Sequence, residues 1–282
     1  MIYTITCNPA IDLFISSFYE ENNKMICGGK GVNVSRTLKT LGTKSKIYGF
    51  LSGKTGEMYE KILDLEFSDT NFIKLKNGET RINLKFNIDN EFEINEDGLK
   101  VDDYSIETLV NQFVELKEND IIILSGSVSK DTSQKIYQKI ISKLKNKCDN
   151  LLFIVDASKD LLINTLAEKP FLIKPNKSEL EETTGKKLNS IDDIISAAKK
   201  LQKMGAENVL VSCGEEGLVF IGSSGEIIIK EAKKVNVIST IGAGDAMVAG
   251  FAYGYSISKD INEAINFALD TASSKISKKS YK

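Results

Sequence analysis

The sequence predicts an α/β protein whose mostly parallel central sheet is covered by helices on both faces. Short unbroken apolar stretches, which are typical of buried strands, alternate with longer stretches whose apolar residues recur at helical spacing. The predicted strands are 121–124, 151–155, 171–173, 209–211 and 219–221, and the helices among them are 106–114, 136–144 and 191–204. The chain has 282 residues with no repeat and no linker, so we expect one domain over residues 1–282.

The N-terminal third predicts a second, smaller sheet. It begins with a strand, a helix and another strand at Ile2–Cys7, Asn33–Leu41 and Lys46–Leu51. From Thr80 to Ile88 apolar and polar residues then alternate, which is typical of a strand with one buried and one polar face. Phe92 and Ile94 continue the alternation after a turn near residues 89–90. We expect these two strands to form a small sheet apart from the main core.

Composition excludes several classes of function. The chain has 37 basic and 39 acidic residues and a net charge of −2, so we expect no nucleic-acid partner. It lacks an apolar run of 18 residues and a basic-then-apolar N-terminus, so we expect no membrane span and no signal peptide. Four scattered cysteines fit a reducing compartment, and the expected location is cytoplasmic. No histidine occurs, so proton transfer falls to carboxylate, lysine, tyrosine, cysteine or solvent.

A glycine-rich turn predicts a site for a phosphate that gains charge during transfer. A β-rich stretch, Val235–Ile238, precedes it and a helix follows it. The small side chains of Gly242, Ala243 and Gly244 let backbone amides approach an anion at the positive end of that helix. Asp245 lies in the first helical turn, where its carboxylate can accept a proton from an attacking hydroxyl. The alternative is an aspartate that only caps the helix.

A second motif follows the apolar strand that ends at residue 173. Pro175 favours an extended residue before it, so Asn176 can begin a helix with Glu179 three positions later on the same face. An amide oxygen and a carboxylate in this arrangement can bind a hydrated Mg²⁺ ion. The alternative is an ordinary N-terminal capping pair.

A third motif follows the strand 209–211. Ser212, Gly214 and Gly217 place a hydroxyl and two glycines where a phosphate could lie against the backbone. The alternative is a hairpin turn.

A fourth group of residues suits a sugar phosphate. Asp12 follows the first strand and can accept hydrogen bonds from two sugar hydroxyls, and the glycines around Gly29 let the backbone close on a ligand. Lys30 and Asn33 supply donors, and Arg81 offers a guanidinium fork to a phosphate. The alternatives are a turn-forming Asp12, a solvated Lys30 and a surface Arg81.

Two familiar nucleotide motifs are not satisfied. Ser52–Thr55 resembles the end of a P-loop, but that motif needs glycine where the chain has Tyr48, so we interpret the segment as a turn with a solvated lysine. No Gly-x-Gly-x-x-Gly stands where a dinucleotide site would need it.

Taken in order, the four motifs resemble those of the ribokinase-like carbohydrate kinases. The two signatures are Gly28–Asn33 and Ser239–Asp245, with Lys174–Glu179 between them, and the resemblance covers about residues 1–275. It implies a three-layer sandwich with a mostly parallel central sheet. It also implies a small β-sheet lid formed by about residues 11–27 and 78–96, which closes over the substrate, excludes water and often mediates a homodimer.

The resemblance also implies roles for individual residues. Asp245 matches the catalytic base, and Gly242, Ala243 and Gly244 match the anion hole. Asn176 and Glu179 match positions that organise Mg²⁺, which we expect to be bound through water. The residues expected on the sugar-phosphate side are Asp12, Gly29, Lys30, Asn33 and Arg81. The residues expected to contact the co-substrate ATP are Lys174, Asn176, Ser212, Gly214, Gly217, Thr240 and Gly244.

Within this family, Gly29–Gly31 and Thr80–Asn83 are most similar to the branch of bacterial 1-phosphofructokinases and tagatose-6-phosphate kinases. The implied reaction transfers the γ-phosphate of ATP to the 6-hydroxyl of fructose 1-phosphate. Tagatose 6-phosphate and fructose 6-phosphate remain alternative substrates. A non-catalytic sensor of sugar phosphate or nucleotide is the alternative of another class.

Overall fold

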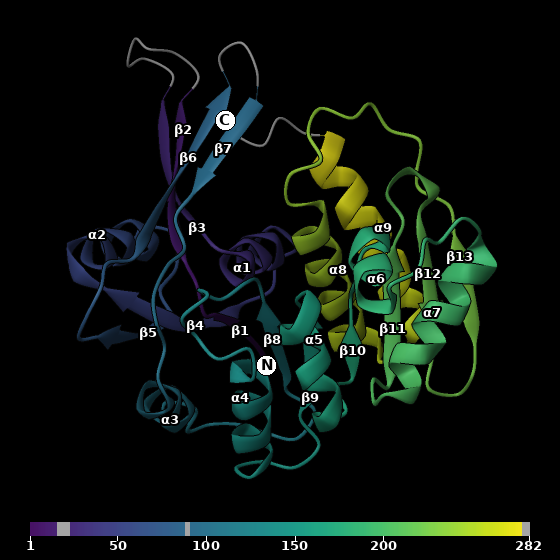
Figure 1. Ribbon diagram of the computed structural model, residues 1–282, viewed down its shortest axis with the longest axis horizontal. Coiled ribbons are helices and arrows are strands. Elements are labelled where there is room, and N and C mark those ends of the chain that lie inside the picture. Colours follow the sequence, from purple (N-terminus) through teal and green to yellow (C-terminus); the bar gives the residue numbers. More distant parts are fainter. Residues whose placement is uncertain (16–22, 88–90, 278–282) are drawn as a thin grey trace.

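The computed structural model describes residues 1–15, 23–87 and 91–277, and a nine-stranded sheet forms its centre (Figure 1). In spatial order the strands are β13 (Ile227–Lys230), β12 (Leu218–Ile221), β11 (Asn208–Ser212), β10 (Leu172–Ile173), β9 (Leu152–Asp156), β8 (Ile121–Ser125), β1 (Ile2–Thr6), β4 (Ser45–Ser52) and β5 (Thr70–Leu75). Neighbouring strands are parallel except in the pairs β11–β12 and β12–β13. The predicted mostly parallel sheet is therefore confirmed.

Helices cover both faces of this sheet and make the predicted three layers. They are α1 (Lys30–Thr40), α2 (Gly53–Asp64), α3 (Asp103–Asn111), α4 (Ile136–Lys145), α5 (Lys159–Thr165), α6 (Lys177–Thr184), α7 (Ile191–Lys203), α8 (Ala243–Ser258) and α9 (Ile261–Ser277). In β8, Ile122 and Leu124 pack in the core with α3, α4 and α7, whereas Ile121 and Ile123 pack with α1, α8 and α9. Because both faces are buried, the central strands are unbroken apolar runs.

A second sheet of four strands stands off the main body beside α1 and α2 (Figure 1). Its order is β3 (Lys24–Gly28), β2 (Ala10–Ile15), β6 (Arg81–Asn87) and β7 (Glu91–Asn95). The β2–β6 pair is parallel and the other two pairs are antiparallel. These strands match the two ranges predicted for the lid except at Ala10 and Gly28, which lie one residue beyond them. Within those ranges, residues 16–22, 88 and the turn at 89–90 lie outside the described residues.

The strand register places a row of polar side chains on one face of the small sheet and the next row, which is apolar, on the opposite face. Asp12, Asn83 and Asn95 are paired across β2, β6 and β7, so their side chains lie on one face. The next row pairs Met25 with Leu13, Leu13 with Leu84 and Leu84 with Ile94, and it lies on the opposite face. We call these the polar row and the apolar row.

The β-rich stretch Val235–Ile238 does not become a strand. These residues form no strand, and Val237 and Ile238 are about half exposed. The backbone amide of Ile238 instead donates to the carbonyl of Ile276 at the end of α9 (2.8 Å). High β propensity gives no strand where no neighbouring strand can pair with it.

The interpretation of Ser52–Thr55 as a turn is wrong, because helix α2 begins there. Its first amides face a carboxylate of the same chain: Lys54 and Thr55 donate to Glu79 at 3.3 and 3.0 Å. The amide of Thr55 and then that of Lys54 lower the pKa of Glu79. A protein side chain thus occupies the anion position that the P-loop comparison would have given to a phosphate.

Candidate active site

Most of the predicted site residues gather at the carboxyl ends of the parallel strands, where α/β sheets bind ligands. A cavity of about 270 Å³ opens there. It is lined by Thr6, Asn8, Gly29, Lys30, Arg81, Ser125, Gly126, Ser127, Ala157 and Ser158. Three polar atoms of its lining, Thr6 Oγ1, Asn8 Oδ1 and Arg81 Nε, are buried without a hydrogen-bond partner among the described residues. Such atoms are suited to a polar ligand.

Asp245 lies in the first turn of α8 with only 6% of its surface exposed, as predicted for its position in the chain. The side-chain amide of Asn33, on α1, donates to its Oδ2 atom at 2.8 Å. Burial raises the pKa of Asp245 to about 6, and the carboxylate of Asp156 acts in the same direction. Asn33, Lys30 and Lys174 oppose this shift. A carboxylate with this pKa is ionised at neutral pH yet basic enough to accept a proton.

The turn before α8 has an anion-binding geometry that differs in one residue from the prediction. Gly242 has a φ of 78°, a left-handed conformation that favours glycine. The amides of Gly242 and Gly244 donate to no group within the described residues, so they are available to an anion. The amide of Ala243, also predicted for the anion hole, donates instead to the carbonyl of Thr240 (3.2 Å). The hole therefore has two available amides.

Two lysines lie against these glycines. A Cβ atom built on Gly244 would be 3.3 Å from Lys174 Nζ, and one on Gly242 would be 3.1 Å from Lys275 Cε. Lys275 lies in the last turn of α9 and was not predicted. It escaped sequence reasoning because its proximity depends on how α9 packs on α8. Here a Cβ on Gly250 would lie 2.4 Å from the carbonyl oxygen of Phe267, so glycine permits the close approach.

A buried carboxylate joins the two predicted halves of the site. Asp156 is 1% exposed, and its oxygens lie 3.2 Å from Lys174 Nζ and 3.4 Å from Lys30 Nζ. Burial alone would raise its pKa, but Lys174 and then Lys30 outweigh burial and lower it. Ser125 donates to the same carboxylate at 3.2 Å. Asp156 and Ser125 were not identified from the sequence. Both follow apolar residues at the end of a strand, and polar residues in that position often line a ligand site.

The polar row organises the residues predicted to bind the sugar phosphate. Asp12 accepts from Asn83 at 2.8 Å and lies 3.4 Å from Lys85 Nζ. A Cβ on Gly28 would lie 2.3 Å from the Asp12 carboxylate, so only glycine fits there. Arg81 donates to the carbonyls of Glu96 and Asn8, both at 3.1 Å, which leaves its Nε atom unpaired. Lys85 was not singled out from the sequence.

Asn176 and Glu179 form the N-terminal capping pair that was the alternative to a metal site. The Asn176 side chain accepts from the Glu179 amide, and the Glu179 carboxylate accepts from the Asn176 amide, both at 2.8 Å. This is a complete capping box. The described residues hold no cluster of three potential metal-binding His, Cys, Asp or Glu side chains. The metal role stays a prediction.

Ser212, Gly214 and Gly217 lie at the hairpin between β11 and β12, which is the alternative given above for that motif. Gly217 has a φ of 96°, and a Cβ there would lie 2.0 Å from the carbonyl oxygen of Lys230. Ser212 also forms a parallel bridge with Asn176. The two motifs predicted to contact the nucleotide are therefore neighbours in space.

Known proteins are similar to this chain over most of its length. The model of the pfkB family carbohydrate kinases matches residues 6–281. A 1-phosphofructokinase from Borreliella burgdorferi is 36% identical over 278 residues, which cover 95% of this chain and 89% of the relative. A 1-phosphofructokinase from Bacillus subtilis is 35% identical over 285 residues, with coverage of 97% and 91%.

Among solved structures, phosphofructokinase-2 from Escherichia coli in complex with fructose-6-phosphate is similar at a TM-score of 0.86 and 26% identity, covering 98% of this chain and 93% of that one. The family match over residues 6–281 includes every motif described above. The chain therefore belongs to the pfkB family of carbohydrate kinases.

Proposed function

We propose that the protein is an ATP-dependent 1-phosphofructokinase, which converts fructose 1-phosphate and ATP into fructose 1,6-bisphosphate and ADP. The observation that carries this is the buried Asp245 carboxylate, adjacent to two available amides and to the lysines that flank them. The full-length relatives named 1-phosphofructokinase support the choice of substrate.

In the proposed reaction, the sugar 6-oxygen forms a bond to the γ-phosphorus while the bond between that phosphorus and the β-γ bridging oxygen breaks. Asp245 accepts the hydroxyl proton, and ADP leaves with the bridging oxygen. The amides of Gly242 and Gly244, with Lys174 and Lys275, stabilise the charge on the transferred phosphoryl group. The nucleotide lies along Lys174, Asn176, Ser212, Gly214, Gly217 and Thr240, and the sugar phosphate along Asp12, Gly29, Lys30, Asn33 and Arg81.

We also propose that Mg²⁺ accompanies ATP near Asn176 and Glu179. The capping box engages each of these two side chains through a single bond, and a carboxylate has further lone pairs, so contact through water fits the donor set. When bound, the ion neutralises charge on the phosphate oxygens.

The substrate assignment is tested by an ADP-release assay over fructose 1-phosphate, tagatose 6-phosphate and fructose 6-phosphate. We expect fructose 1-phosphate to have the highest kcat/KM. Equal kcat/KM for all three would contradict the specific assignment. A higher value for fructose 6-phosphate would favour the activity implied by the ligand in the Escherichia coli structure. No ADP release with any of them would support the sensor.

The rate should depend on the ionisation of Asp245. Its pKa is about 6 in the ligand-free protein, and the protonated form cannot accept the hydroxyl proton. We therefore expect kcat to fall about tenfold per pH unit below the pKa that Asp245 has in the enzyme–substrate complex. The measurement is kcat at saturating sugar phosphate from pH 4.5 to 8, because a phosphate monoester itself titrates near pH 6 and would distort KM. A kcat that stays flat over the whole range from pH 8 to 4.5 would exclude Asp245 as the base.

The small sheet is proposed to act as a lid and to join two copies of the chain through its apolar row. Met25 is 44% and Ile94 is 53% exposed on that face, which is large for apolar side chains. Ile94→Lys should shift sedimentation from dimer to monomer. Val114→Lys makes the same change at another exposed residue, outside the small sheet, and should leave the dimer intact. An unchanged dimer in Ile94→Lys would place the interface elsewhere.

We further propose a cytoplasmic location, supported by four cysteines that are all free thiols. Within the described ranges, no helix has the length and apolarity needed to cross a membrane.

A further inference from the structure

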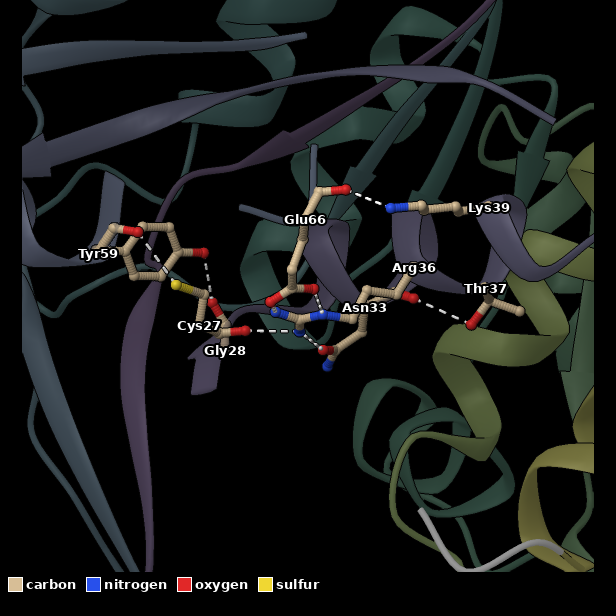
Figure 2. Close-up of polar contacts among 8 residues, drawn as sticks. All are labelled: Cys27, Gly28, Asn33, Arg36, Thr37, Lys39, Tyr59 and Glu66. Atoms are coloured by element: carbon tan, nitrogen blue, oxygen red, sulfur yellow. Dashed lines mark hydrogen bonds and ion pairs between the residues drawn. The ribbon is translucent and has the colours of Figure 1, made fainter. Parts of the chain in front are cut away.

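A network of polar contacts lies at the side-chain oxygen of Asn33 (Figure 2). The side-chain nitrogen of the same residue donates to Asp245. We propose that Arg36 is a positioning residue that orients the Asn33 amide toward Asp245 and anchors the joint between the small sheet and α1. This inference rests on the proposed role of Asp245 as the base, and it assigns the orientation of that base to a residue outside both proposed substrate sites.

Arg36 is held rigidly by its own partners. Its Nε and Nη2 atoms donate to the two carboxylate oxygens of Glu66 at 2.6 and 2.8 Å, a bidentate pair that fixes the plane of the guanidinium. Nη1 remains and donates to the carbonyl of Cys27 at 2.6 Å and to Oδ1 of Asn33 at 3.3 Å. Burial alone would lower the pKa of Arg36, but the hydrogen bonds and charge of Glu66 outweigh burial and raise that pKa, so the guanidinium stays charged.

The orientation of the Asn33 amide follows from donor and acceptor chemistry. A guanidinium has donors only, so the Asn33 oxygen must face Arg36. The amide nitrogen then points to Asp245, whose ionised carboxylate has acceptors only. Without Arg36, the amide could rotate and present its oxygen to the carboxylate, which is repulsive. The spacing permits the contact because residues 33 and 36 lie on one face of α1.

The same network fixes the end of β3 against α1. Cys27 and Gly28 end β3, and Gly28 lies against the Asp12 carboxylate. Tyr59, on α2, donates from its hydroxyl to the Gly28 carbonyl at 2.8 Å and accepts from the Cys27 thiol at 3.2 Å through its own carbonyl. Arg36 is therefore the only residue drawn in Figure 2 that bonds to both β3 and Asn33.

Several charged and polar groups face Asp245. Of these, Asn33 is the one that accepts a hydrogen bond from Arg36. Lys30 approaches from α1, Asp156 from the end of β9, and Lys174 from the segment after β10. The Asn33 hydrogen bond lowers the pKa of Asp245, so its loss should raise that pKa further. An Arg36 variant should therefore move the pH dependence, which a merely structural residue would not do.

The experiment compares Arg36→Met with a matched control, Lys39→Met. Lys39 lies one turn further along α1 and donates to the backbone carbonyl of Glu66, so this change removes the same charge near the same partner without touching Asn33 (Figure 2). Two quantities are measured: kcat for fructose 1-phosphate, and the titration midpoint of the Asp245 carboxyl carbon by NMR in the ligand-free protein.

For Arg36→Met we expect kcat to fall about tenfold, KM for ATP to stay within twofold, and the Asp245 midpoint to rise by about 0.5–1 pH unit. Lys39→Met should change neither kcat nor the midpoint. In an Asn33→Ala background, Arg36→Met should have little further effect, because both substitutions remove the same hydrogen bond. Arg36→Lys keeps the positive charge but loses the bidentate contact with Glu66. We expect its Asp245 midpoint to rise as well, but by less than in Arg36→Met.

An unchanged midpoint in Arg36→Met, or a loss of kcat that is fully additive with Asn33→Ala, would overturn the proposal. If Arg36→Met does not fold, an unchanged midpoint in Arg36→Lys overturns it equally. The NMR titration needs no turnover, so a wild-type protein without kinase activity would refute the proposed function and leave this test decisive.

Discussion

Asp245→Asn is expected to lower kcat by about 10² to 10⁴, the usual loss when a general base is removed. Asparagine keeps the shape of the side chain, and Asn33 can still donate to its carbonyl oxygen, so the site geometry should persist. The two available amides and the lysines are untouched, and ATP binding measured by calorimetry should stay within about threefold of wild type. Turnover is measured by coupled ADP release, and a kcat within threefold of wild type would exclude Asp245 as the base.

The same variant is expected to be more stable than wild type above pH 6. The folded-state pKa of Asp245 is raised to about 6 from an ordinary value of 3.8, so the carboxyl prefers to stay protonated in the folded protein. Ionisation therefore costs stability as pH rises from about 4 to 6, by about 3 kcal/mol in total. Asparagine removes this cost. Denaturant unfolding at pH 8 should show the gain, and at pH 3.5 the two proteins should be nearly equal.

Lys174→Met is expected to lower the free energy of unfolding by about 3 kcal/mol at pH 7. Lys174 and Asp156 are 4% and 1% exposed, and breaking a buried pair from one side leaves a poorly compensated charge. Lys30 still pairs with Asp156, which keeps the loss at the lower end of the usual range. Because the Asp156 pKa is lowered in the folded state, the loss should shrink as pH falls through that pKa.

Two controls separate this loss from a general effect of removing a lysine. Lys159→Met breaks an exposed pair with Glu182 (3.6 Å) and should cost at most about 1 kcal/mol. The double variant Lys174→Met/Asp156→Asn should recover part of the stability, because it removes the uncompensated charge. A double variant less stable than Lys174→Met would show that the pair is not the cause.

Much of the fold could be predicted from the sequence because the local residue pattern of these strands matches their burial in the structure. The unbroken run Ile121–Leu124 is buried on both faces, and the alternating run from Thr80 has one polar face, as its period predicts. Val235–Ile238 forms no strand, because β propensity says nothing about whether a neighbouring strand is present. Helix α2 was missed because its start depends on Glu79, which is 25 residues away in sequence from Lys54.

The candidate site was readable only in part, for a similar reason. Asp245 and the glycines before it are consecutive, so their positions follow from one turn and one helix. For Asn176 and Glu179, sequence spacing does not distinguish a metal site from a capping box, because both use the same three-residue interval. Arg36 resembles any polar residue on a helix, and its importance depends on Glu66 and Cys27, which other elements bring to it.

The alternation of polar and apolar rows in the small sheet makes it sensitive to insertion. Asp12 and Asn83 lie on the same face of the small sheet because β2 and β6 pair in the observed register. One amino acid added between Arg81 and Ile82 would turn Asn83 to the opposite face and bring the Ile82 side chain into the polar row. A substitution in this strand therefore changes one side chain on one face. A single-codon insertion should instead disrupt both faces at once, so that the proposed sugar recognition and the exposed apolar surface are lost together.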